Sequence, residues 1–174
     1  MKLHVKSKIF SIHHKMDILN EDDELVYQVS SKAISMHDKT YLTDAAGREV
    51  AYLHAKLISI HNIHYVDMHD GTSFSLSEEL FHLRDVIDID GLGWKLQGDF
   101  LAHDFMICSN DGRILATAHR KWVSLHNMYY LDILDESQMD LIVACYVVLE
   151  HILSLRQEER ADTASHASGN SPAK

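Results

Sequence analysis

The stretch Leu141-Ile-Val-Ala-Cys-Tyr-Val-Val-Leu149 decides how this chain folds. Asp135 or Ser137 can cap a helix that contains it, and the pattern predicts a helix from residue 136 to about Arg156. A soluble helix that is apolar on every side must be buried on every side. The run has nine residues, whereas a membrane span needs about 20, so we expect no transmembrane segment. The rest of the chain must therefore enclose this helix.

The residues before the helix predict antiparallel strands. Between the turn signals, apolar and polar residues alternate, as Phe74 and Leu76 do among serines. Alternating runs bounded by turns of this kind are typical of hairpins. The turn signals are Asn20-Glu-Asp-Asp23, Asp44-Ala-Ala-Gly47, Asp70-Gly71, Gly91-Leu-Gly93 and Asn110-Asp-Gly112. The sequence therefore predicts a mainly β fold in which a sheet wraps around the helix.

Two of the expected hairpins repeat one another. Residues 54–68 align without a gap to residues 119–133, and seven of the fifteen positions are identical. A shorter copy, Lys8-Ile-Phe-Ser-Ile-His13, opens the chain. Each copy is interpreted as strand, tight turn, strand. Because His and Asn tolerate positive φ better than most residues, the turns are expected at His13-His14, His61-Asn62 and His126-Asn127.

Length, charge and cysteine content narrow the class of protein. The 174 residues fit one domain, placed at residues 1–156, and a polar tail at 157–174 that is disordered by composition. The formal net charge is −10, whereas nucleic-acid binding needs a basic surface, so no nucleic acid is expected as a partner. Cys108 and Cys145 lie in apolar runs and are too few for a disulfide framework. Without an apolar signal segment near Met1, a cytoplasmic protein is expected.

Several motifs together resemble the LURP-one-related family. They are the repeated Lys-x-x-Ser hairpins, the segment Arg120-Lys-Trp-Val-Ser124, the terminal apolar helix and, most specifically, Ile89-Asp-Gly-Leu-Gly-Trp-Lys-Leu-Gln-Gly-Asp-Phe-Leu-Ala-His-Asp-Phe105. The resemblance covers residues 1 to about 155. It implies the tubby C-terminal-like fold, a closed antiparallel β-barrel around a central hydrophobic helix, which tubby domains and phospholipid scramblases share.

The resemblance implies no settled activity, since a shared fold is a weak guide to chemistry. Tubby domains bind phosphoinositides through a strongly basic surface, which this acidic chain lacks. Scramblases carry a cysteine cluster and a terminal helix of membrane length, which are also absent from the sequence.

No motif predicts catalysis, a cofactor or a metal. Gly91-x-Gly93-x-x-x-x-Gly98 lacks the spacing of a nucleotide-binding loop, and the chain has no Gly-x-Ser-x-Gly elbow. The fourteen histidines, which include His61-x-x-His64, are not spaced as zinc ligands are. Glu150 and His151 adjoin on the helix and point about 100° apart, so they are not expected to face each other. The sequence therefore predicts a protein that is not an enzyme and needs no cofactor.

The corresponding lysines of the three repeat copies, Lys8, Lys56 and Lys121, are the candidate ligand-binding residues. In a closed barrel, hairpins of the same register would bring them near one rim, and neighbouring Lys6 and Arg120 would add positive charge. Such a spot is suited to a phosphate or carboxylate group.

The first hypothesis for function is therefore a non-enzymatic binding module that engages a lipid head group, a small ligand or a protein partner. Two alternatives remain: an enzyme that acts on a small molecule in a pocket at one end of the barrel, and a structural adaptor. An adaptor would self-associate and carry no ligand.

Overall fold

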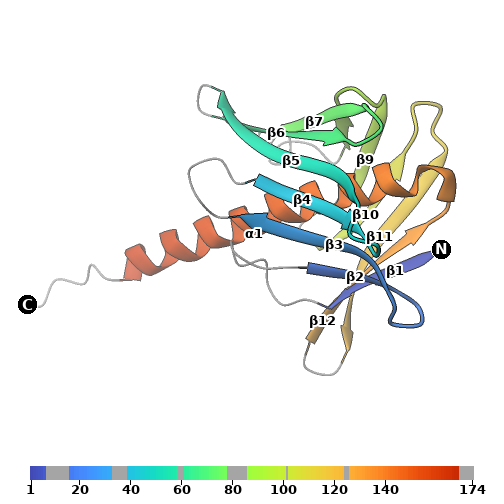
Figure 1. Cartoon of the computed structure of the whole chain (residues 1–174). Coiled ribbons are helices and arrows are strands. Elements are labelled where there is room, and N and C mark those ends of the chain that lie inside the picture. Colours follow the sequence, from blue (N-terminus) through green and yellow to red (C-terminus); the bar gives the residue numbers. More distant parts are fainter. Residues whose placement is uncertain are drawn as a thin grey trace, which may run out of the picture.

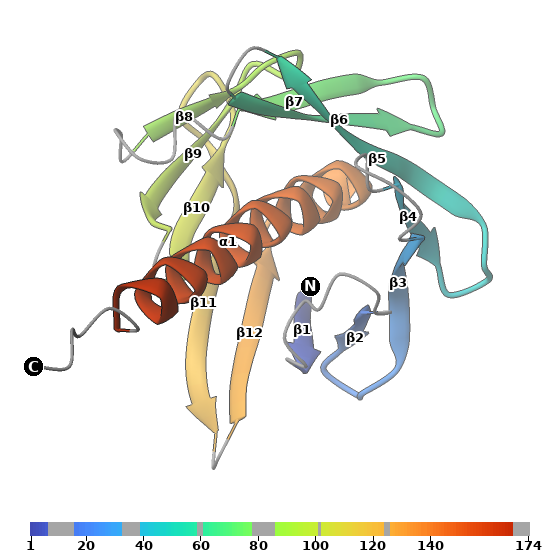
Figure 2. The ribbon, with the colours of Figure 1, turned by 90° about the vertical axis from the view of Figure 1, so that its left-hand side faces the viewer.

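The chain forms one curled antiparallel sheet with a long helix through its centre (Figures 1 and 2). The computed structural model describes residues 1–6, 16–32, 39–58, 61–77, 86–100, 102–123 and 126–168. Within these ranges, helical structure is confined to a 3-10 turn, η2 (Glu136–Gln138), and the helix α1 (Met139–Ser168). The predicted β-barrel around a central C-terminal helix is confirmed.

Twelve strands make up the sheet, and their order closes it almost completely. The order is β7-β6-β5-β4-β3-β2-β1-β12-β11-β10-β9-β8. The outermost strands of this order are β7 and β8. Ser75 of β7 forms an isolated bridge with Asp90, which directly follows β8, so the barrel is nearly closed. The strands are β1 (Lys2–Lys6), β2 (Met16–Asn20), β3 (Leu25–Lys32), β4 (Lys39–Asp44), β5 (Glu49–Ile58), β6 (His61–Met68), β7 (Ser73–Ser77), β8 (Val86–Ile89), β9 (Trp94–Asp99), β10 (Asp104–Cys108), β11 (Ile114–Val123) and β12 (His126–Ile133).

The two-residue period of the strands places one row of side chains inside the barrel. In β7, for example, Phe74 and Leu76 are buried between outward-facing serines. These inner rows join α1 in one core, in which every residue from Ile142 to Leu149 is at most 2% exposed. The apolar stretch is therefore the buried centre of the barrel. Neither α1 nor any other described helix is long and apolar enough to cross a bilayer.

The start of α1 agrees with its sequence signals, but its end does not. The carboxylate of Asp135 accepts a hydrogen bond from the backbone N–H of Ser137 and caps η2, which leads into α1. The expected end near Arg156 is wrong, because α1 continues to Ser168, and Figure 1 shows this part extending beyond the strands. Residues 157–168 include two Glu, three Ala, one Gln and one Arg, and the high helix propensity of these residues accounts for the longer helix. The domain boundary at residue 156 stays a prediction.

The two long repeat copies form hairpins of matching register. Lys56 of β5 pairs with Ile63 of β6, and Lys121 of β11 pairs with Met128 of β12. The expected turns at His61-Asn62 and His126-Asn127 are wrong, because these residues belong to β6 and β12. Their cross-strand partners are Ile58 and Leu57 in the first hairpin and Val123 and Trp122 in the second. Because the strand pairing reaches Ile58 and His61 in the first hairpin and Val123 and His126 in the second, only two residues remain to connect the strands of each. Two residues is the commonest length of a hairpin loop. The third expected turn, His13-His14, lies outside the described residues.

The corner between β9 and β10 is tightly packed. Gly98 has φ +139°, and a Cβ there would lie 2.5 Å from the carbonyl oxygen of Asp104. Its strand partner is Phe105, so only glycine allows this close approach. Within the same corner, His103 adopts φ +54°, which is uncommon for a residue with a side chain.

Candidate functional site

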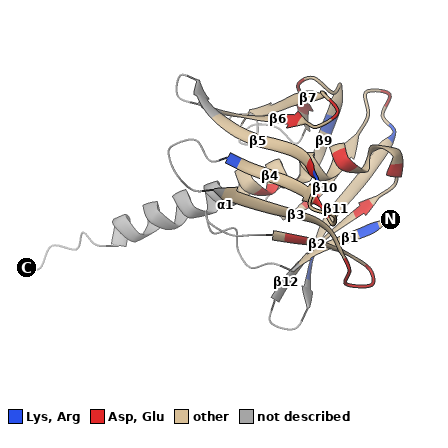
Figure 3. Cartoon of the chain, viewed as in Figure 1, with Lys and Arg blue, Asp and Glu red and all other residues tan. Residues whose placement is uncertain are grey.

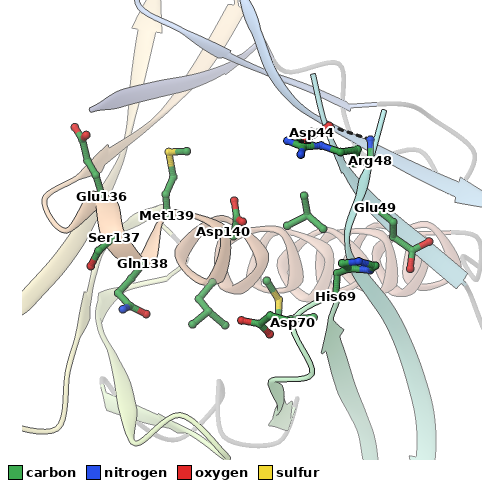
Figure 4. A pocket seen from close by; sticks show the side chains of 13 residues that line it. Asp44, Arg48, Glu49, His69, Asp70, Glu136, Ser137, Gln138, Met139 and Asp140 are labelled. Atoms are coloured by element: carbon green, nitrogen blue, oxygen red, sulfur yellow. Dashed lines mark hydrogen bonds and ion pairs between the residues drawn. The ribbon is translucent and has the colours of Figure 1, made fainter. Parts of the chain in front are cut away.

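A cavity of about 820 Å³ opens at the end of the barrel where α1 begins (Figure 4). In Figure 4, η2 contributes Glu136, Ser137 and Gln138 on one side, while Arg48, Glu49 and His69 lie on the other. Apolar side chains also line it, namely Val50, Met68, Met139 and Leu141. Volumes of 300–1,000 Å³ or so are usual for sites that bind small molecules.

The lining of this cavity carries more negative than positive charge. Five of its residues are acidic and one, Arg48, is permanently cationic; the acidic ones are Asp44, Glu49, Asp70, Glu136 and Asp140. Figure 3 shows acidic residues, in red, at the turns and the helix start at this end of the barrel. The cavity therefore favours positively charged over negatively charged molecules.

Some of these carboxylates are fixed by local bonds. Asp44 accepts a hydrogen bond from the backbone N–H of Arg48, and the Arg48 guanidinium lies 2.6 Å from its other oxygen. These contacts hold the pKa of Asp44 below its usual value. The backbone N–H of Thr72 donates to Asp70 and lowers the pKa of that carboxyl in the same way. Both groups are therefore negatively charged at neutral pH.

The start of α1 is tied to the barrel wall from inside. The buried Tyr27 of β3 donates a hydrogen bond to the carboxylate of Asp140, which lines the cavity. Burial, followed by the contact with Asp140, raises the pKa of the Tyr27 hydroxyl. Tyr27 therefore remains a neutral donor over the whole physiological pH range.

A second polar contact lies ten residues further along α1, where a buried carboxylate meets a buried histidine. Oε1 of Glu150 lies 3.0 Å from Nδ1 of His103, and the two side chains are 8% and 4% exposed. Nε2 of His103 is buried without a hydrogen-bond partner among the described residues. The His103 ring also meets Tyr129 of β12 edge-on, with ring centroids 4.8 Å apart.

The negative charge of Glu150 acts on two neighbouring tyrosines. Burial, with the Glu150 carboxylate as a further cause, raises the pKa of Tyr146. The same two causes raise the pKa of Tyr129, against a hydrogen bond with Arg120 that lowers it. Both phenols therefore stay protonated beside the His103–Glu150 pair.

The next residue of α1 faces a different wall of the barrel. The ring of His151 meets that of His64 in β6, with centroids 5.6 Å apart. The sequence-based expectation that Glu150 and His151 do not face each other is thus confirmed. In the part of the chain that the structure describes, no three His, Cys, Asp or Glu side chains come together as a metal site.

Of the three candidate lysines, only Lys121 has a described side chain. It is exposed, and its ammonium group lies 5.3 Å from the ring centroid of Tyr130. The two residues line a groove of about 400 Å³ on the outside of the barrel, together with Lys2, His4 and His119. Three carboxylates, those of Glu21, Asp23 and Asp132, line the same groove and offset its positive charge.

The strand order does not bring Lys56 and Lys121 together. Their strands, β5 and β11, are separated by five strands in either direction around the barrel, so the two residues lie on opposite sides. Lys8 lies outside the described residues. A ligand contact by any one of these lysines stays a prediction.

Sequence reasoning missed both the cavity and the His103–Glu150 pair. The cavity joins two distant turns to the start of α1, and only the strand order brings them together. The pair joins residues 47 positions apart. One signal did exist, because Glu150 ends a run of apolar residues on a helix expected to be buried, and a buried carboxylate needs a partner.

Comparisons with known proteins agree with this architecture. The family described as LURP-one-related matches residues 1–150. A solved protein structure from Arabidopsis thaliana superposes with a TM-score of 0.57 and 16% sequence identity, over 87% of this chain and 91% of that chain. At this identity the likeness concerns the fold alone. No curated protein matches the chain.

Proposed function

Because the chain belongs to the LURP-one-related family, whose barrel here holds an open acidic cavity, we propose that it is a non-enzymatic module that binds a small organic cation. The observation that carries this proposal is the cavity of about 820 Å³ at the start of α1. Its acidic rim attracts an ammonium or guanidinium group, and its apolar lining accepts the carbon chain between such groups.

The arrangement of the polar groups favours binding over catalysis. Asp44 and Arg48 neutralise each other, and Asp70 and Asp140 are each held by a hydrogen bond. Groups fixed in this way present constant charge to a ligand. A general base needs a pKa near the working pH, whereas the contacts of Asp44 and Asp70 lower theirs.

A cytoplasmic location remains part of the proposal. Cys108 and Cys145 are both free and buried, and burial raises the pKa of both thiols. Unreactive thiols of this kind are compatible with a reducing compartment.

Spermidine is a suitable probe, because it combines positive charges with an apolar chain. In amide NMR titrations at low salt, spermidine is expected to shift resonances of Glu49, His69 and Gln138, whereas citrate should leave them in place. Glu49→Gln together with Asp70→Asn should weaken the binding of spermidine severalfold, since two charges are lost while both shapes are kept. The amide oxygen that Asp70→Asn introduces can still accept the bond from Thr72.

Asp88→Asn is the matched control, because Asp88 lies on β8 outside the cavity and its side chain is 67% exposed. It should bind spermidine as the parent does. Shifts scattered over the surface, or equal weakening by the control, would contradict the proposal. Recovery of a chemically altered spermidine would favour the enzyme alternative.

A further inference from the structure

The apolar part of α1 specifies its position in the barrel only weakly. Hydrophobic burial is non-directional, and cores accept exchanges between apolar side chains of similar volume. From Ile142 to Leu149, every side chain of α1 is apolar or aromatic and buried. These residues place the helix inside the barrel, but a shift by one turn exchanges one apolar residue for another.

Glu150 is different, because its carboxylate meets its partner on the barrel wall in only one axial position of α1. A shift by one turn, about 5.4 Å, would bring Tyr146 or Ser154 to the place of Glu150. Glu150 would then lose Nδ1 of His103, its contact with the barrel wall, and breaking such a buried polar contact is strongly unfavourable. His103 is also held in place, because its left-handed backbone forms part of the tight corner between β9 and β10.

The contact between Tyr27 and Asp140 fixes the helix at its other end. Asp140 and Glu150 are ten residues apart, or about 15 Å along the axis. The wall contacts also lie far apart around the barrel, since four strands separate β3 from β10 on the shorter path. The two directional contacts lie at different positions along the axis of α1 and on different walls of the barrel. Together they fix both the axial position and the rotation of α1.

We propose that His103 and Glu150 are a positioning pair that sets the register of α1 and thereby the shape of the cavity formed around Met139, Asp140 and Leu141. The cavity is the site of the proposed function, but the register of α1 can be measured without any ligand. The two proposals can therefore fail separately.

Amide NMR of the full chain tests the positioning role through residues that lie far from the substitution. Glu150→Leu and His103→Asn each remove the pair, and Asn suits the positive φ at position 103. In either variant, Gln138, Met139 and Leu141 should show displaced or doubled resonances, as expected for a helix with more than one register. Glu150→Gln keeps the shape and a hydrogen bond to His103, so it should restore single resonances near the parental positions.

Leu149→Ala is the matched control, because it opens space in the neighbouring part of α1 without touching a polar contact. It should lower the melting temperature while the resonances of Gln138 and Met139 stay single. The positioning role is overturned if Glu150→Leu or His103→Asn folds with parental resonances at the cavity, or if Leu149→Ala displaces them equally. It is also overturned if both pair variants fail to fold while Leu149→Ala folds, since the pair would then support the whole fold.

Discussion

The hydroxyl of Tyr27 donates a hydrogen bond to the carboxylate of Asp140, and it thereby joins the inner face of β3 to the first turn of α1. Tyr27 is 2% exposed, so this is a polar contact at the edge of an otherwise apolar core. It is the point at which the barrel wall, the helix and the candidate cavity meet.

Tyr27→Phe should lower the free energy of unfolding by about 1.5–3 kcal/mol, because a hydrogen bond to a charged acceptor is lost. Its effect should also depend on pH. The pKa of Tyr27 is raised in the folded state, so the stabilisation is complete below the unfolded value, about 10. It decreases as the pH rises above 10, because the unfolded state then releases a proton that the folded state retains. Urea unfolding at pH 7 and at pH 11 should show a smaller difference between parent and variant at pH 11, and equal differences would contradict this account.

Val143→Asp and Val147→Asp should each cost several kcal/mol, against a total stability of roughly 5–15 kcal/mol. Both valines are completely buried in the apolar core, where a new carboxylate would lie among hydrophobic side chains. Val86→Asp is the matched control, because Val86 of β8 is 39% exposed and should tolerate the same change. Thermal unfolding distinguishes them. A soluble Val143→Asp protein that melts within a few degrees of the parent would show that α1 is not central.

Gly98→Ala should destabilise the protein by about 2–4 kcal/mol, because it combines an unfavourable φ with a steric overlap at Asp104 and Phe105. Gly112→Ala isolates the effect of the unfavourable φ. Gly112 also has a positive φ, but no atom of the described residues lies within 4 Å of the position that its Cβ would take. Chemical denaturation should therefore show a clearly smaller loss for Gly112→Ala. Equal losses would mean that the close approach of β9 and β10 is unimportant.

A chain that ends at Arg160 should melt at the parental temperature, because the residues that follow offer few apolar side chains to bury. Ending the chain at Glu150 is the contrasting variant. It removes Ile152 and Leu153, which are buried, and should lower the melting temperature markedly. A large drop in the melting temperature of the chain that ends at Arg160 would show that the end of α1 packs against the barrel.

The lysine hypothesis predicts that a variant with Lys8, Lys56 and Lys121 all changed to Gln binds anionic vesicles less well than the parent. Because Lys56 and Lys121 lie on opposite sides of the barrel, the loss should arise from one lysine rather than from all three. Single Lys→Gln variants in a vesicle sedimentation assay measure this. Equal binding by the triple variant and the parent, or no binding by the parent, contradicts the hypothesis.

The sequence predicts the features of this fold that depend on local chemistry. The run from Leu141 to Leu149 identifies the buried helix because its composition alone requires burial. Turn residues such as Asp70-Gly71 mark hairpins because few residue types suit their backbone angles. The misplaced turns at His61-Asn62 show the limit, since strand pairing across the ladder overrode a weak local preference.

The candidate site could not be predicted in the same way, because it depends on which strands become neighbours. Nothing local indicates that His103 faces Glu150, or that the turn at Asp70 lies opposite Gln138. These relationships follow from the closure of the sheet, which is a property of the whole chain.

The strand order affects how the protein can fold during its synthesis. β1 pairs with β12, and α1 follows both, so neither the barrel wall nor its apolar core is complete until α1 has left the ribosome. Such long-range pairing makes folding slow, and the apolar inner faces of all twelve strands stay uncovered until α1 has been synthesised. The nascent chain should therefore depend on chaperones, and mutations that delay the docking of α1 should reduce yield in the cell more than they reduce the stability of the finished barrel.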